Sequence, residues 1–270
     1  MEHELGLTTL FNNYLAEPAN AVLNLVGVHA NNPARPWEDS LVMELLVVAI
    51  LMVAAVLIRT SLSAENPGGL QHVFESIYGF IAQTARDAGV EQPAKFLAYF
   101  ATIFIFIVSM NLIGIIPAFA SPTMSPWVPA GLAVWTFLYF NFAGFSTNGL
   151  GYLKHFAGPI WWLAPFMFTI EMISNFIRPL SLTVRLYGNM YAGEQVTLVF
   201  LGLTKLVVPV IFMALHVFVS LIQAYVFTIL TMIYIAGATA HGHGEGHGKS
   251  DGQGGHTDEH PEHVLLTAVP

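Results

Sequence analysis

The sequence predicts an all-α integral membrane protein with about five membrane-crossing helices, one of them very long and tilted, plus an amphipathic helix on the membrane surface. Of its 270 residues, 55% are hydrophobic and only 10% are charged, whereas a soluble domain is about a quarter charged. Several apolar runs reach the length of about 20 helical residues that crosses a bilayer. One run is about twice that length and contains four charged residues.

Composition also excludes several classes of protein. The chain has no cysteine, which excludes disulfides and thiol chemistry. Its net charge of −8 comes mostly from the two ends and argues against nucleic acid as a partner. No internal repeat or phosphate-binding glycine loop is visible, and we expect no cofactor and no metal centre.

Five apolar runs are expected to form the membrane domain within residues 41–240. They cover residues 41–58, 96–119, 127–145, 160–203 and 207–236. At 1.5 Å per residue the fourth run would be roughly 66 Å long, against a hydrocarbon core of about 30 Å. We therefore expect strong tilt, a bend near Pro179, or a break.

Basic residues predict the orientation. Five spans put the termini on opposite sides of the membrane, and the basic residues concentrate on the side of the C-terminus. The positive-inside rule then places residues 1–40 outside and the C-terminus in the cytoplasm. The start of the chain lacks the basic residues of a secretory signal, so we expect the first span to be retained. The basic residues on the C-terminal side are Arg59, Arg86, Lys95, Lys154 and Lys249, against Arg35 and Lys205 on the other side.

Two segments differ from the spans. In residues 68–89 apolar side chains recur at spacings of three and four, which predicts an amphipathic helix with Asn66 as N-cap and Pro67 as first residue. It can lie on the cytoplasmic membrane surface or pack against the loops of a partner. The tail, residues 241–270, is rich in Gly, His and acids and is expected to be disordered. Its histidines can chelate zinc or nickel, but nothing fixes their geometry, which favours a solvated extension.

One helical stripe in the fourth run contains most of its charge. Glu171, Arg178 and Arg185 are spaced seven and seven, which puts them on one face of a helix. Asn189 extends the stripe by one turn, while Glu194 faces the opposite side, roughly 13 Å from Arg185 along the axis. A guanidinium at membrane depth costs about 2.5 to 17 kcal/mol and keeps its charge. A permanent cation between two offset acids predicts ion movement along a discontinuous path.

The last run adds polar residues that suit a proton relay. His216 and Gln223 are seven apart on one face, and Tyr234 follows eleven residues later. Histidine exchanges protons near neutral pH, and glutamine can orient a guanidinium without neutralising it. Gly188 and Gly193 in the long run allow a neighbouring helix to approach closely.

Simpler roles remain open for several of these residues. Arg178 can snorkel towards the cytoplasmic interface, and Tyr234 can anchor the end of the last span. His216 can make a structural hydrogen bond between helices, and Arg185 can form a static ion pair with either acid. Glu44, near the outer end of the first run, is expected at a channel mouth or among lipid headgroups.

Three segments resemble subunit a of the F-type ATP synthases, and the resemblance covers about residues 41–236. They read RPLSLTVRLYGNMYAGE (178–194), LHVFVSLIQAYVF (215–227) and NLIGIIP (111–117). The resemblance implies a stator subunit of a bacterial inner membrane, lying beside a rotating ring of c subunits. Other subunits of the synthase, including b-type peripheral stalk subunits, and the lipid bilayer are the further partners it implies.

The resemblance also implies a role for each residue that matches the family pattern. Arg185 takes the place of the essential arginine, and Glu194 with His216 that of the outer half-channel pair. Gln223 matches the glutamine near the arginine, Asn189 the polar residue one turn on, and Glu171 the acid of the cytoplasmic half-channel. Asn111 belongs to the third matching segment. The family often has an acid where this chain has Gly114.

The implied mechanism moves protons without catalytic chemistry in this chain. A proton enters past Glu194 and His216, neutralises a ring carboxylate, and later leaves towards Glu171. Arg185 attracts the ionised ring site and blocks a direct leak between the half-channels. A proton-coupled secondary transporter is the alternative, but such proteins usually show internal repeats. A purely structural subunit would not need these charged groups.

Overall fold

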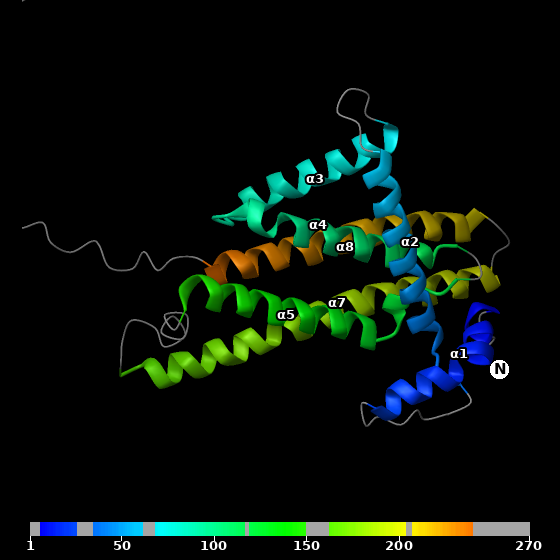
Figure 1. Cartoon of the computed structure of the whole chain (residues 1–270), viewed down its shortest axis with the longest axis horizontal. Helices are drawn as coiled ribbons and strands as arrows, with labels where there is room; N and C mark the ends of the chain where they lie inside the picture. The colour runs from blue at the N-terminus through cyan, green and yellow to red at the C-terminus, as the bar shows by residue number, and fades with distance from the viewer. Residues whose placement is uncertain are drawn as a thin grey trace, which may run out of the picture. The chain divides into compact units, whose positions relative to one another are not determined.

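The regular elements of the protein are all helical in the part of the chain that the structure, a computed structural model, describes. These residues are 6–25, 35–61, 68–116, 119–149, 162–203 and 207–239. The elements are α1 (Gly6–Leu25), α2 (Asp39–Ser61), α3 (Gly69–Asp87), α4 (Pro93–Ile113), the 3-10 helix η1 (Pro122–Met124), α5 (Trp127–Asn148), α7 (Ala164–Leu203) and α8 (Val207–Thr239). In Figure 1, α4, α5, α7 and α8 run in similar directions, and α2 crosses them. The predicted all-α membrane fold is confirmed.

Four of these helices are long and apolar enough to cross a membrane by length and composition. They cover Asp39–Thr60, Pro93–Ile113, Trp127–Asn148 and Val210–Thr239. The fifth predicted span, α7, is not among them because its charged residues lower its hydropathy. It runs unbroken through Pro179 for 40 residues, which excludes the break that the sequence left open. The predicted start of this run at residue 160 lies outside the described residues.

The second predicted span was too long at its C-terminal end. Residues 96–119 were expected to be helical, but α4 ends at Ile113 with Gly114 as C-cap, and residues 119–121 are not helical. The sequence explains the early end, since a proline disfavours helical backbone in the residue before it, and Pro117 follows closely. The chain then forms the short helix η1, which packs between α2, α4, α5 and α7.

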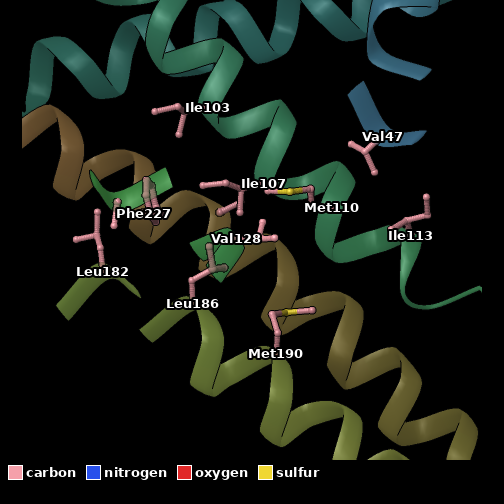
Figure 2. Packing of buried hydrophobic residues seen from close by; sticks show 12 residues of the cluster. Val47, Ile103, Ile107, Met110, Ile113, Val128, Leu182, Leu186, Met190 and Phe227 are labelled. Carbon is pink, nitrogen blue, oxygen red and sulfur yellow. The ribbon is translucent and has the colours of Figure 1, made fainter. Parts of the chain in front are cut away.

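Two buried clusters hold the helices together. One joins α3, α4, α5 and α8 around Phe100 and Phe140. The other joins α2, α4, α5, α7 and α8, and Figure 2 shows its side chains pointing towards one another. Leu182, Leu186 and Met190 supply the α7 face of this second cluster, and each is at most 2% exposed. Because they are spaced four apart, they form one stripe that docks α7 on the bundle.

The amphipathic helix is confirmed as α3, although its start and its packing differ from the prediction. Its N-cap is Gly68, two residues beyond the predicted Asn66; Asn66 and Pro67 lie outside the described residues. Ile81 and Ala85 are fully buried in the first cluster, and α3 contacts α4 and α8. Part of its apolar face is therefore covered by helices of its own chain, while Val73 and Phe80 are 55% and 49% exposed.

A helix that the sequence did not predict, α1, precedes the first span. Trp37, just before α2, joins the two. Its backbone N–H donates to Asn12 Oδ1 at 3.1 Å, and its indole N–H donates to the Leu15 carbonyl at 3.0 Å. The ring of Phe11 meets the indole edge-on at 5.5 Å. Segment 1–40 therefore contains ordered structure attached to the membrane domain, while the tail, 241–270, lies outside the described residues.

Candidate ion-translocation site

Arg185 lies on α7 beside the face that packs into the bundle, but its own side chain is exposed. Leu182 and Leu186, three residues before it and one after it, are buried at 2% and 0% exposure. In the described segments Arg185 makes no ion pair and no hydrogen bond. Exposed apolar side chains lie near it, since Val184 is 59% exposed and Leu180 is 61% exposed. A cation on an apolar open surface calls for an anionic group supplied from outside this chain.

One turn after Arg185, an amide pair joins α7 to α8. Asn189 Nδ2 donates to Gln223 Oε1 at 2.7 Å. Gln223 is 3% exposed, and its own Nε2 is buried without a hydrogen-bond partner among the described residues. No hydrogen bond joins Gln223 to Arg185 in this part of the chain. Gln223 therefore accepts a hydrogen bond from Asn189, and its amide nitrogen has donors that no described residue uses.

Further along α7, a histidine of α8 fills the space that a glycine leaves. A Cβ atom added at Gly193 would lie 3.0 Å from Nδ1 of His216. His216 is 9% exposed, and its Nε2 is buried without a hydrogen-bond partner among the described residues. A cavity of about 330 Å³ adjoins it, with Asn189 on its wall. Glu194, next to Gly193, is partly exposed, so the structure brings the two predicted relay residues into one region.

At the other end of the stripe the charges are paired. Arg178 Nη2 lies 3.6 Å from Glu171 Oε1. The guanidinium carbon of Arg178 also lies 5.0 Å from the centre of the Tyr234 ring of α8. Arg178 is therefore held by two groups within the protein, and Tyr234 faces that cation and the bundle rather than serving only as an interfacial anchor.

Asn111 belongs to a buried hydrogen-bond chain behind the relay histidine. It is 0% exposed; its Oδ1 accepts from Thr123 Oγ1 at 2.8 Å, and its Nδ2 donates to the Ser220 carbonyl at 3.5 Å. Ser121 Oγ lies 2.8 Å from Thr123 Oγ1 and donates to the carbonyl of Met110 at 3.0 Å. Since Ser220 is one helical turn from His216, this network contacts the α8 backbone near the relay.

Glu44 lies apart from these residues. It lines a cavity of about 560 Å³ together with Glu38, Trp127 and Trp135, where the N-terminal ends of α2 and α5 approach each other. The structure therefore does not bring Glu44 together with Arg185 or His216. No group of three residues able to hold a metal ion occurs among the described residues.

Comparison with known proteins decides the family. Residues 41–236 match the family described as ATP synthase A chain. A protein of Solibacter usitatus (strain Ellin6076) described as ATP synthase subunit a is 54% identical over 235 residues, which are 87% of this chain and 100% of the relative. A protein of Koribacter versatilis (strain Ellin345) with the same description is 45% identical over 244 residues, 90% of this chain and 100% of the relative. The chain belongs to the ATP synthase A chain family.

Membership of the ATP synthase A chain family, together with the four candidate spans, makes the chain a multi-pass component of the membrane sector of an ATP synthase. A further relative, from Pelobacter propionicus (strain DSM 2379 / NBRC 103807 / OttBd1) and described as ATP synthase subunit a 3, is 43% identical over 198 residues, 73% of this chain and 86% of that protein. The family assignment does not favour a secondary transporter.

Close packing accompanies the glycine that replaces the acid often found in this family. A Cβ atom at Gly114 would lie 2.6 Å from the Cβ of Ser121 and 2.9 Å from its backbone nitrogen. No acid fits there unless the loop moves. The polar groups beside this position come instead from Ser121 and from Thr123, whose hydroxyls lie 2.8 Å apart, and Thr123 also donates to Asn111 Oδ1.

Sequence reasoning missed two features of the site. The Arg178–Glu171 ion pair was not predicted, because a spacing of seven exceeds the i+4 spacing at which helical pairs usually form. Asn175, also on α7, was missed as well: its Nδ2 donates to Asn141 Oδ1 of α5 at 3.3 Å, and its own Oδ1 is buried without a hydrogen-bond partner in the described residues. The sequence signal that could have identified Asn175 is its position as a polar residue between Glu171 and Arg178 on an otherwise apolar helix.

Proposed function

We propose that the chain moves protons through two offset half-channels to and from a ring of c subunits, so that proton flow drives rotation and ATP synthesis. The observation that supports this best is Arg185, an exposed cation that has no ion pair or hydrogen bond in the described segments and lies beside the exposed apolar side chains of Val184 and Leu180. A ring carboxylate provides the missing anion. At about 4 Å such a pair is worth roughly 4 kcal/mol at an effective dielectric near 20.

The two half-channels correspond to the two polar regions on either side of Arg185. Glu194 and His216 serve the outer one, where a proton reaches the ring carboxylate and neutralises it. Glu171 serves the cytoplasmic one, which receives the proton that the ring later releases. Arg185 neither donates nor accepts a proton, because its guanidinium stays charged. Its charge attracts the ionised ring carboxylate and prevents protons from passing directly between the two half-channels.

The proposed arrangement in the cell follows from the same assignment. The exposed face of α7 around Arg185 meets the c ring, while other faces of the membrane domain meet b-type peripheral stalk subunits and lipid. The chain lies in the inner membrane of a bacterium with its N-terminus outside and its C-terminus in the cytoplasm, as the distribution of basic residues favours.

Substitution of Arg185 tests the proposed function. Arg185→Ala should abolish ATP-driven proton pumping in inverted membrane vesicles while leaving the chain inserted and assembled, as shown by co-purification with the ring. Arg185→Lys should fail as well, because a lysine can lose its proton when buried and lacks the planar fork. Pumping at the parental rate in Arg185→Ala would refute the proposal.

A further inference from the structure

A tyrosine of α8 lies over the ion pair at the Glu171 end of α7. The Cζ atom of Arg178 is 5.0 Å from the centroid of the Tyr234 ring, while Nη2 of the same side chain is 3.6 Å from Oε1 of Glu171. A guanidinium within about 6 Å of an aromatic face is attracted by the ring quadrupole. Arg178 is therefore held from two directions, by a carboxylate of its own helix and by a ring of the neighbouring helix.

The ion pair alone holds the Glu171 carboxylate weakly. The side chains of Arg178 and Glu171 are 29% and 40% exposed, and one contact at 3.6 Å joins them. Pairs with this exposure contribute little, because water screens the charges and two long side chains must be ordered. A spacing of seven residues also requires both side chains to extend along about two turns of the helix.

Tyr234, by contrast, is fixed by packing. Its ring centroid lies 5.8 Å from that of Phe140 on α5, and Phe140 is 1% exposed. Tyr234 also packs against both buried clusters of the bundle. Because the ring is already ordered, holding the guanidinium costs it little further conformational freedom.

We infer that Tyr234 is a positioning residue for proton exit: its ring face holds Arg178, and Arg178 holds the Glu171 carboxylate where it receives protons from the c ring. The proton leaves the ring carboxyl as its O–H bond breaks, binds a carboxylate oxygen of Glu171, and passes to water on that side of the membrane. The inference rests on the proposed function, in which Glu171 serves the cytoplasmic half-channel. It assigns the task to the aromatic face of Tyr234 and not to its hydroxyl.

The test compares variants of the assembled complex by ATP-driven proton pumping in inverted vesicles, normalised to the amount of complex; protons then cross the cytoplasmic half-channel in the reverse direction, past the same Glu171 carboxylate. Tyr234→Phe keeps the ring and should pump at the parental rate. Tyr234→Leu removes the ring and should lower the rate about two- to ten-fold, the range that a cation–π contact accounts for. The control is Tyr225→Leu, since Tyr225 is also a partly buried tyrosine of α8, and its ring contacts Phe80 at 5.6 Å rather than a cation; it should pump at the parental rate.

A double variant shows whether Tyr234 acts through Arg178. If it does, Arg178→Gln with Tyr234→Leu should be no slower than Arg178→Gln alone, because the first change already removes the contact. The Tyr234→Leu defect should also vary with the pH outside the inverted vesicles, which is the cytoplasmic side, and not with the pH inside. A purely structural role of the ring would produce neither result.

Several outcomes would overturn the inference. These are equal losses in Tyr234→Phe and Tyr234→Leu, an equal loss in Tyr225→Leu, or defects of Tyr234→Leu and Arg178→Gln that multiply. If Tyr234→Leu does not assemble, Tyr234→Met is the second non-aromatic variant, and failure of both to assemble means that the ring is only structural. The proposed function is judged separately: if Arg185→Ala is inactive, a negative result at Tyr234 refutes this inference alone.

Discussion

The two ends of the charged part of α7, at Glu171 and at Glu194, hold their polar groups in different ways. At the Glu171 end, Arg178 has a carboxylate at 3.6 Å and an aromatic ring at 5.0 Å. At the Glu194 end, His216 lies in the space above Gly193 with a buried nitrogen that has no partner in the described residues. At the Glu171 end, electrostatic attraction holds the side chains in place. At the Glu194 end, the shape of the space over Gly193 holds His216, whose Nε2 has no hydrogen-bond partner in the described residues. Substitutions at the two ends should therefore fail for different reasons.

The largest effect is expected from substitutions of the relay pair, Glu194 and His216. Glu194→Gln and His216→Ala should each slow proton pumping about 100-fold or more, the usual loss when a proton-transfer group is removed. If both belong to one relay, the double variant should be no worse than the slower single variant. Exchanging the two residues should restore part of the flux. Pumping measurements in which the single losses multiply would indicate two independent roles and would weaken the comparison.

A smaller loss is expected when the fit around His216 is disturbed. Gly193→Leu should slow pumping about 10- to 100-fold, because a displacement of about 1 Å in a reacting group is enough for such a loss. The Cβ atom alone already comes within 3.0 Å of the imidazole. Gly188→Ala is the control, since a Cβ atom at Gly188 meets nothing within 4 Å, and it should pump normally. An active Gly193→Leu complex would show that the imidazole position is not critical.

A substitution at Gly114 tests whether close packing also matters in the loop that contains Ser121. Gly114→Asp should destabilise the folded complex by about 1–3 kcal/mol through overpacking, because the added Cβ would lie 2.6 Å from that of Ser121. Gly79→Asp is the control, since nothing lies within 4 Å of a Cβ there and Gly79 belongs to α3, which is not among the candidate spans. Thermal unfolding of the purified complex measures the difference. Equal stability of the two variants would mean that the loop at Ser121 adjusts freely.

The smallest effect is expected from the tail, residues 241–270. A chain ending at Ala240 should assemble and support normal proton-driven ATP synthesis, and zinc should not change coupling. The reason is compositional, since the six histidines between residues 241 and 263 stand among glycines and acids, a pattern that does not predict a fixed metal site. Synthesis rates compared at mildly acidic and neutral cytoplasmic pH provide the measurement. A marked difference from the full chain would identify the tail as a regulator.

Much of the fold could be predicted because its signals are local. Apolar runs of the right length located α2, α4, α5 and α8, and apolar residues spaced three and four apart located α3. Residues spaced seven apart share a face only if the helix is continuous, and α7 is unbroken from Ala164 to Leu203. The positions of Glu171, Arg178 and Arg185 on one stripe followed from that periodicity alone.

What the sequence did not predict depends on contacts between distant residues. Asn12 pairs with Trp37, which is 25 residues away, and no local pattern in α1 indicates that contact. Ring contacts such as that between Arg178 and Tyr234 depend on how α7 and α8 pack. Gly193 was expected to allow close approach of a helix, but the structure was needed to show that His216 occupies the space.

The length of α7 has a consequence for the timing of rotation. Its 40 residues make a helix about 60 Å long, which fits a hydrocarbon core of about 30 Å only if the helix is strongly tilted from the membrane normal. Glu171 and Glu194 are about 35 Å apart along the helix. In a strongly tilted α7, the two proposed half-channels are therefore separated more within the membrane plane than along the membrane normal. For a ring turning beside α7, a sideways separation is an arc. Under the proposed function, the pitch of one helix thus sets the angle through which a loaded site must travel before it can unload.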